Sequence, residues 1–139
     1  MTSWLETQFS LVGKKALVTG SSKGIGAAIA QALAHAGADI VLVGRAEESL
    51  KETKSAIERI GRKVEAVLCD VSSAEAIKDA FADIADLKVD ILVNNAGSIS
   101  RAPAAETEMQ DWHRIIDTNL NSVFQISQAC GQAMIAKGS

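Results

Sequence analysis

The 139-residue sequence contains no tyrosine and a single proline. No side-chain phenol is therefore available in this chain as an acid or a base. No uninterrupted apolar run reaches the roughly 18 residues that a transmembrane helix needs, so we expect no membrane-spanning segment. The N-terminal stretch Met1–Ser10 has no basic region leading into an apolar core, which argues against a secretory signal.

Neither sign of charge dominates the chain. Lysine and arginine number 14 against 17 aspartates and glutamates, giving a net charge of −3. This balance argues against a nucleic-acid partner and against a polybasic membrane surface. There are only two cysteines, Cys69 and Cys130, both in apolar surroundings. We expect them to be buried free thiols, which fits a cytoplasmic location.

Metal-ligating residues are also scarce. The two histidines, His35 and His113, fall in separate predicted helices, where surface roles are the usual ones. We therefore expect no metal site. Apolar residues make up 47% of the chain and charged residues 22%, which is typical of a globular domain with one core.

Apolar strands and amphipathic helices alternate along the sequence. We expect strands at residues 14–19, 39–43, 63–69 and 89–93, and helices at 24–36, 47–60, 72–87 and 109–134. The last helix contains an interruption near 118–121. Serine and threonine spacing predicts capping boxes at Ser72 with Glu75 and at Thr107 with Gln110. Along the first long helix, the predicted apolar face consists of Ile25, Ile29, Ala32, Leu33 and Ala36.

The strands are rich in valine, isoleucine, leucine and alanine without strict alternation, which is typical of strands buried on both faces. Strands separated by helices imply right-handed parallel crossovers. The pattern predicts a single α/β domain with three layers and the strand order 3-2-1-4.

A glycine-rich turn follows the first strand. Gly20, Gly24 and Gly26 lie between the strand and the first long helix, where a side chain would collide with a ligand. Free backbone amides and the helix dipole favour an anion at such a junction. A tight turn without any ligand is the alternative, because a glycine triplet alone is weak evidence.

Four motifs lie in order along the chain: Thr19–Gly26 (TGSSKGIG), Asp70-Val71, Asn94–Gly97 (NNAG) and Asn119. Together they resemble the short-chain dehydrogenase/reductase family over nearly the whole sequence. The resemblance implies a Rossmann-type doubly wound parallel sheet, here incomplete. It also implies that residues 1–139 form one dinucleotide-binding domain.

The resemblance implies a role for each motif. Asp70 would accept the adenine amino group, Asn94 would lie near the adenosine ribose, and Asn119 would be catalytic, its backbone carbonyl holding a water of a proton relay. The alternatives are ordinary turn residues and a solvated helix residue. The expected cofactor-binding residues are Thr19, Gly20, Ser22, Lys23, Gly24, Ile25, Gly26, Arg45, Asp70, Val71, Asn94, Ala96 and Gly97.

The second strand bears on the choice of cofactor. In NAD-binding relatives an acid at the end of this strand binds both ribose hydroxyls. Gly44 occupies that place here, Arg45 follows, and Lys23 lies in the glycine loop. An arginine binds phosphate well, so we expect NADP(H) rather than NAD(H). Alternatively, Arg45 points into solvent. The acids Glu47 and Glu48 are expected to begin a helix, whose positive end favours them.

The family's catalytic Tyr-x-x-x-Lys pair and its preceding serine have no counterpart in the sequence. Ser98 and Ser100 lie near the expected site, but no base is placed to activate them. We expect the chain to be the N-terminal part of a longer enzyme that interconverts a secondary alcohol and a ketone on a small polar metabolite.

The segment containing Arg101 and Trp112 is similar to the sugar-acid dehydrogenases of the family, and Arg101 suits a substrate carboxylate or, equally, a surface salt bridge. The family implies a homo-oligomer, a tetramer, for the full-length form. A non-catalytic nucleotide-binding module is the alternative function. A purely structural interaction domain would leave four ligand-facing motifs unexplained.

Overall fold

The structure, a computed structural model, describes residues 2–138. Four parallel strands form one sheet: β1 (Lys15–Thr19), β2 (Asp39–Gly44), β3 (Val64–Leu68) and β4 (Ile91–Val93). Their order is β3-β2-β1-β4, which confirms the predicted topology. The register pairs Lys15 with Asp39, Ala16 with Ile91 and Ile40 with Val64.

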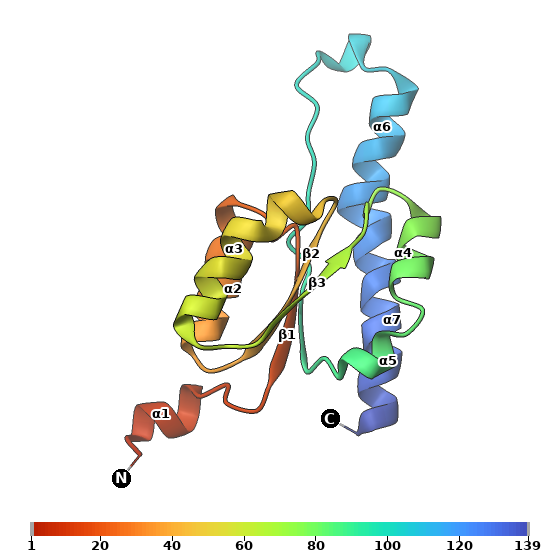
Figure 1. Cartoon of the computed structure of the whole chain (residues 1–139). Helices are drawn as coiled ribbons and strands as arrows, with labels where there is room; N and C mark the ends of the chain where they lie inside the picture. The colour runs from red at the N-terminus through yellow and green to blue at the C-terminus, as the bar shows by residue number, and fades with distance from the viewer. Residues whose placement is uncertain (1, 139) are drawn as a thin grey trace.

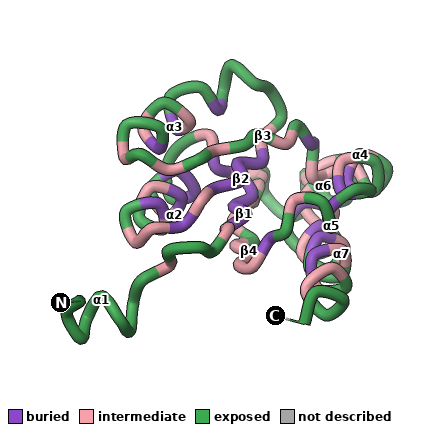
Figure 2. Tube along the Cα trace, turned by 60° about the horizontal axis from the view of Figure 1, so that its bottom comes forward, coloured by how far each residue is buried: buried purple, intermediate pink, exposed green. Residues whose placement is uncertain are grey.

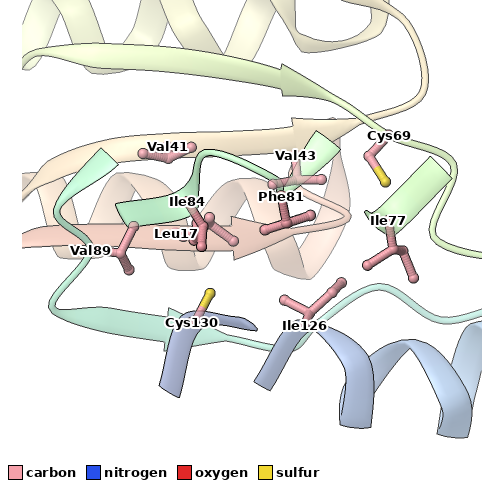
Figure 3. Close-up of a cluster of buried hydrophobic side chains, with 10 residues drawn as sticks. All are labelled: Leu17, Val41, Val43, Cys69, Ile77, Phe81, Ile84, Val89, Ile126 and Cys130. Atoms are coloured by element: carbon pink, nitrogen blue, oxygen red, sulfur yellow. The ribbon is translucent and has the colours of Figure 1, made fainter. Parts of the chain in front are cut away.

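Helices cover both faces of the sheet. The helices α2 (Gly24–His35) and α3 (Glu47–Ile60) lie on one face, and α4 (Ala74–Ala80), α5 (Ile84–Leu87) and α7 (Ser122–Lys137) lie on the other (Figure 1). Alternate residues of β1 enter opposite cores. Leu17 packs with Phe81 and Ile126 on the α7 side (Figure 3), whereas Ala16 and Val18 face α2. The three-layer arrangement is confirmed.

The expectation of strands buried on both faces holds only in the centre of the sheet. Residues of β1 and β2 are almost fully buried, as Figure 2 shows, but β3 exposes Glu65, Ala66 and Leu68 and β4 is half-buried. The reason is position: β3 and β4 are the edge strands of this sheet.

Three predicted helix features are wrong. The helix expected over 72–87 is divided into α4 and α5, and its N-cap is Ser73 rather than Ser72. Ser73 Oγ accepts the Ala76 amide at 3.2 Å, while Ser72 is bonded to Asp70. Thr107 does not cap the next helix either, since its hydroxyl donates to the Pro103 carbonyl at 3.1 Å.

The buried face of α2 also differs from the prediction. It consists of Gly26, Ala27, Ala30 and Ala34, whereas Ile25 and Ala32 are exposed. Ile29 and Leu33 pack at the margin of the core. At Gly26 the reason is the backbone of the glycine turn, since an added Cβ there would lie 2.2 Å from the Gly20 carbonyl oxygen.

The last helical segment is continuous but irregular. It begins as α6 (Met109–Ile116), passes through a π-helical turn η2 (Asp117–Asn121) and continues as α7. The interruption predicted near 118–121 is therefore a π turn. The hydroxyls of Thr118 and Ser122 donate to the carbonyls four residues earlier. Such turns occur frequently at functional sites.

Two shorter helices complete the described chain. The helix α1 (Trp4–Phe9) begins with a capping box between Ser3 and Glu6 and projects away from the sheet (Figures 1 and 2). A short 3₁₀ turn, η1 (Ala104–Glu106), precedes α6. Within residues 2–138, every helix is too short or too polar to cross a bilayer.

The 139-residue chain is expected to associate in solution. The outer side of α6–α7 exposes large apolar side chains: Met109 (64%), Trp112 (52%), Leu120 (62%), Phe124 (67%) and Ile135 (83%). The edge of β4 is unpaired as well. Exposed apolar surface and open strand edges both drive association. Light scattering on the purified chain measures this, and a compact monomer that unfolds in one step would contradict it.

Candidate functional site

A cleft of about 890 Å³ runs along the carboxyl edge of the sheet. In open parallel sheets this edge is where ligands bind, at the point where the strand order reverses. The order reverses here between β1 and β4. The walls come from the glycine turn, the ends of β2 and β3, the start of α3, the loop after β4, and α6–η2. Its lining residues include Gly20, Ser22, Lys23, Gly24, Arg45, Glu48, Glu52, Asp70, Val71, Ala96, Gly97, Ser98 and Arg114.

The three glycines of the turn are required for different reasons. Gly24 has φ +59° with open space around it, so its backbone conformation is what excludes other residues. A Cβ at Gly26 would lie 2.2 Å from the Gly20 carbonyl oxygen, so lack of space excludes them there. Gly20 combines φ +63° with a Cβ position 2.8 Å from Ala96 Cα. The sequence pattern predicts that a side chain at these positions would collide with a ligand. At Gly20 and Gly26 it would collide with the protein's own backbone.

Thr19 and Asn95 hold the glycine turn against the end of β4. Thr19 Oγ1 accepts the amides of Asn95 and Ala96, each at 3.0 Å. Asn95 Nδ2 donates to the carbonyls of Thr19 (3.0 Å) and Gly20 (3.1 Å). The two strand ends that flank the reversal point are therefore fixed relative to each other.

The N-terminus of α2 has no side-chain cap. Lys23 precedes the helix in an extended conformation, and no side chain accepts from the first turn. By contrast, serine caps α1 and α4. The first amides of a helix have no intrahelical partner, and the helix dipole adds positive potential there. The start of α2 opens onto the cleft through Lys23 and Gly24, so this end of the cleft can bind an anion.

Asp70 and Arg45 lie at the far end of the cleft. Asp70 Oδ1 accepts both the Ser72 hydroxyl (2.7 Å) and the Ser72 amide (3.0 Å). These bonds hold the pKa of the Asp70 carboxyl below its usual value, and the charge of Arg45 adds to the effect. Asp70 is therefore an ionised acceptor at neutral pH. Oδ2 accepts no hydrogen bond from residues 2–138 and remains available.

The loop after β4 is bound to the π turn through Ser98. Asn119 Oδ1 accepts the Ser98 amide and Asn119 Nδ2 donates to the Ser98 carbonyl, both at 2.7 Å. Arg114 Nη1 donates to Ser98 Oγ at 2.5 Å. A hollow of about 460 Å³ adjoins this contact, lined by residues that include Asn94, Gly97 and Asn119.

The structure brings most of the predicted cofactor residues together but separates four of them. Thr19 is buried beneath the loop, Gly26 is buried against Gly20, and Ile25 is 74% exposed outside the cleft. Asn94 lies in the smaller hollow and donates to Ser127 Oγ at 2.9 Å. The residues that line the cleft as predicted are Gly20, Ser22, Lys23, Gly24, Arg45, Asp70, Val71, Ala96 and Gly97.

Three further residues shape the site without having been predicted. Asn95 stands inside the NNAG motif, so the motif signals it, although its two contacts to the glycine turn depend on the tertiary fold. Thr53 of α3 donates to the Ser22 carbonyl at 3.2 Å. Arg114 resembles any charged residue on a helix. The sequence carries no signal for these last two.

The thiol prediction is confirmed. Cys69 and Cys130 are free and buried, and burial raises the pKa of each thiol to about 11. Over residues 2–138 no cluster of three or more His, Cys, Asp or Glu side chains is placed to bind a metal ion.

Comparisons with known proteins identify the family and the fold. The family model for the short chain dehydrogenase matches residues 14–139. The chain belongs to the short-chain dehydrogenase family. Its Rossmann-type parallel sheet, in the order 3-2-1-4, is the fold of the solved relatives.

The relatives similar to this chain include sugar-acid dehydrogenases. A 2-dehydro-3-deoxy-D-gluconate 5-dehydrogenase from Bacillus subtilis (strain 168) is 44% identical over 136 residues, covering 97% of this chain and 53% of the relative. A gluconate 5-dehydrogenase from Gluconobacter oxydans (strain 621H) is 45% identical over 132 residues, covering 94% and 52%. The chain spans about half the length of the curated relatives it matches.

A crystal structure from Beutenbergia cavernae, provisionally assigned as an NAD(P)-dependent gluconate 5-dehydrogenase with NADP bound at low occupancy, superimposes with a TM-score of 0.88 at 41% identity. The match covers 94% of this chain and 53% of that one.

Proposed function

We propose that this chain is the cofactor-binding part of an NADP(H)-dependent oxidoreductase that interconverts a secondary alcohol and a ketone. The cleft at the carboxyl edge of the sheet carries this proposal, because it joins an uncapped helix N-terminus to an arginine and an ionised aspartate. A dinucleotide has matching chemistry: a diphosphate for the helix end, and an adenosine for the other end.

The residues fit such a cofactor. The amides of the first turn of α2 would bind the diphosphate, and Asp70 Oδ2 would accept the adenine amino group. Ala96 and Gly97 would lie close to the cofactor, because neither side chain fills the cleft. When bound, the nicotinamide supplies hydride transfer. The protein's part is to hold and orient it.

Arg45 is proposed to select NADP(H). It is exposed and lines the same cleft as Lys23, so we propose that its guanidinium binds the 2′-phosphate. Glu48 and Glu52 line the same region. Glu48 has a cationic neighbour, since its carboxylate lies 4.0 Å from Lys51 Nζ. The NADP-bound structure from Beutenbergia cavernae supports this choice.

The substitution Arg45→Asp tests the cofactor proposal in the full-length enzyme. It removes a charge-assisted contact and adds an acid, so the Kd for NADP⁺ should rise about ten- to a hundredfold. Affinity for NAD⁺ should change less, because NAD⁺ has no 2′-phosphate for Arg45 to bind. Calorimetric titration measures both constants. Arg59→Asp, an equal charge change at an exposed site in the last turn of α3, is the control. An unchanged NADP⁺ Kd in Arg45→Asp would show that Arg45 faces solvent.

Asn119 is proposed to take part in catalysis through its backbone rather than its side chain. Both polar atoms of its side chain are occupied by Ser98. The π turn around it alters the regular hydrogen bonding of the helix backbone. Asn119 thus fixes the loop after β4, and its backbone carbonyl is proposed to hold a relay water.

The substrate is proposed to be a sugar acid, because sugar-acid dehydrogenases match this chain at 44–45% identity. Arg101 lies exposed in the loop after Gly97 and suits a carboxylate. Oxidation assays with gluconate and a neutral sugar alcohol test this, and equal rates would contradict it. The full-length enzyme is proposed to be a cytoplasmic homotetramer.

A non-catalytic nucleotide-binding module is the second candidate, favoured by the absence of any tyrosine from the 139 residues. The reading frame of the gene beyond the Ser139 codon separates the two. A Tyr-x-x-x-Lys segment there supports the enzyme, and a stop codon supports the module.

A further inference from the structure

Thr53 is a polar residue on an otherwise apolar face. The buried residues of α3 are Leu50, Thr53 and Ile57, and Thr53 is only 3% exposed. A threonine inside a helix usually satisfies its hydroxyl by bonding to the carbonyl four residues earlier. The Thr53 hydroxyl instead donates to a carbonyl outside its own helix, that of Ser22 in the glycine turn, at 3.2 Å.

Other contacts fix the turn before Ser22 but not the peptide that follows it. Ser21 is tied to Val43 by its amide (3.3 Å) and by its hydroxyl, which accepts the Val43 amide at 3.1 Å. Asn95 holds the Gly20 carbonyl. For the peptide between Ser22 and Lys23, Thr53 supplies the one hydrogen bond found within residues 2–138.

The orientation of this peptide sets the direction of the Lys23 amide. In a planar trans peptide the C=O and the following N–H point in opposite directions. With the Ser22 carbonyl bonded to Thr53, the Lys23 N–H is directed away from that helix face. This amide donates to no atom of residues 2–138, and both Ser22 and Lys23 line the cleft.

We propose that Thr53 is a positioning residue of the dinucleotide site: its hydroxyl holds the Ser22 carbonyl and thereby aims the Lys23 amide at a phosphate oxygen of the bound cofactor. This inference rests on the proposed function. Thr53 itself touches no cofactor. It acts from the opposite side of the glycine turn, by preventing rotation of one peptide unit.

The substitution Thr53→Val in the full-length enzyme tests the inference, because valine keeps the β-branched shape and removes only the hydroxyl. The Kd for NADP⁺, measured by calorimetry well below the unfolding temperature, is expected to rise about three- to tenfold. Thr53→Ser, which keeps the hydroxyl, is expected to restore most of the affinity. Comparing the titrations with NAD⁺ and NADP⁺ identifies which phosphate group the Lys23 amide contacts. An equal loss for both dinucleotides assigns the contact to the diphosphate, and a loss confined to NADP⁺ assigns it to the 2′-phosphate.

Ile57→Val is the matched control, one turn further along the same buried face of α3. It is expected to lower the unfolding temperature and leave both Kd values unchanged. The inference is overturned if Thr53→Val binds both dinucleotides like the wild type, if Thr53→Ser is as impaired as Thr53→Val, or if Ile57→Val weakens binding equally. Wild-type protein that binds neither dinucleotide would overturn the proposed function itself.

Discussion

Replacing Gly26 with alanine is expected to abolish dinucleotide binding and to destabilise the fold. The new Cβ would lie 2.2 Å from the Gly20 carbonyl oxygen and 2.5 Å from Asn95 Nδ2. Overpacking of this kind costs about 1–3 kcal/mol, and loss of the Asn95 hydrogen bonds adds to it. Alanine improves helix propensity by only about 1 kcal/mol, so the collision dominates. We expect the Kd for NADP⁺ in the full-length enzyme to rise at least about a hundredfold.

Gly131→Ala is the control for Gly26→Ala. Gly131 lies in the middle of α7, and an added Cβ there would meet nothing within 4 Å. The same substitution should therefore stabilise the enzyme by about 0.5–1 kcal/mol and leave cofactor affinity unchanged. Thermal unfolding and titration of the two variants measure both effects. Wild-type affinity in Gly26→Ala would show that α2 can move away from the glycine turn at little cost.

The second prediction with a large expected effect concerns catalytic turnover by the 139-residue chain alone. The purified 139-residue chain is expected to show no multiple-turnover oxidation or reduction of any alcohol or ketone. It contains no tyrosine, and the family resemblance implies that a tyrosine donates the proton. A positioned general acid or base contributes about 10²- to 10⁴-fold to a rate, so its loss is expected to reduce turnover below detection. Absorbance of reduced nicotinamide at saturating cofactor measures the rate.

A full-length form carrying the Tyr-x-x-x-Lys pair should be active under the same conditions. Its tyrosine-to-phenylalanine variant, which binds cofactor but lacks the phenol, controls for trace contamination and should be as inactive as the 139-residue chain. Repeated turnover by the 139-residue chain would show that another group on this half of the molecule transfers the proton.

The order of the strands was predictable because it depends on local patterns and on handedness. Buried apolar runs mark β1 and β2, and right-handed crossovers leave few arrangements for four parallel strands. The same local reasoning failed at the ends of helices. Ser72 has the spacing of a cap, yet Asp70 lies close enough to accept both its amide and its hydroxyl. Ser73 then caps α4. Two neighbouring serines offer the same chemistry, and only their surroundings distinguish them.

The buried face of α2 was also mispredicted from the local sequence pattern. Periodicity selected the large apolar residues such as Ile25, because burial normally follows side-chain size. The structure buries Gly26 and three alanines instead, and at Gly26 the glycine turn lies too close for any larger side chain. Ile25 is left exposed. A sequence pattern ranks residues by hydrophobicity, whereas a close contact between two backbones selects for small size.

The sequence by itself determined the family and the parallel sheet, because motifs and strand periodicity can be read along the chain without knowing which distant residues meet. The tertiary structure decided which atoms meet at the site. It joined Asn119 to Ser98, Asn95 to Gly20 and Thr53 to Ser22. These partners are separated in the chain by many residues, and a hydrogen bond requires positions accurate to a few tenths of an ångström. Only the packing of the helices on the sheet sets such positions.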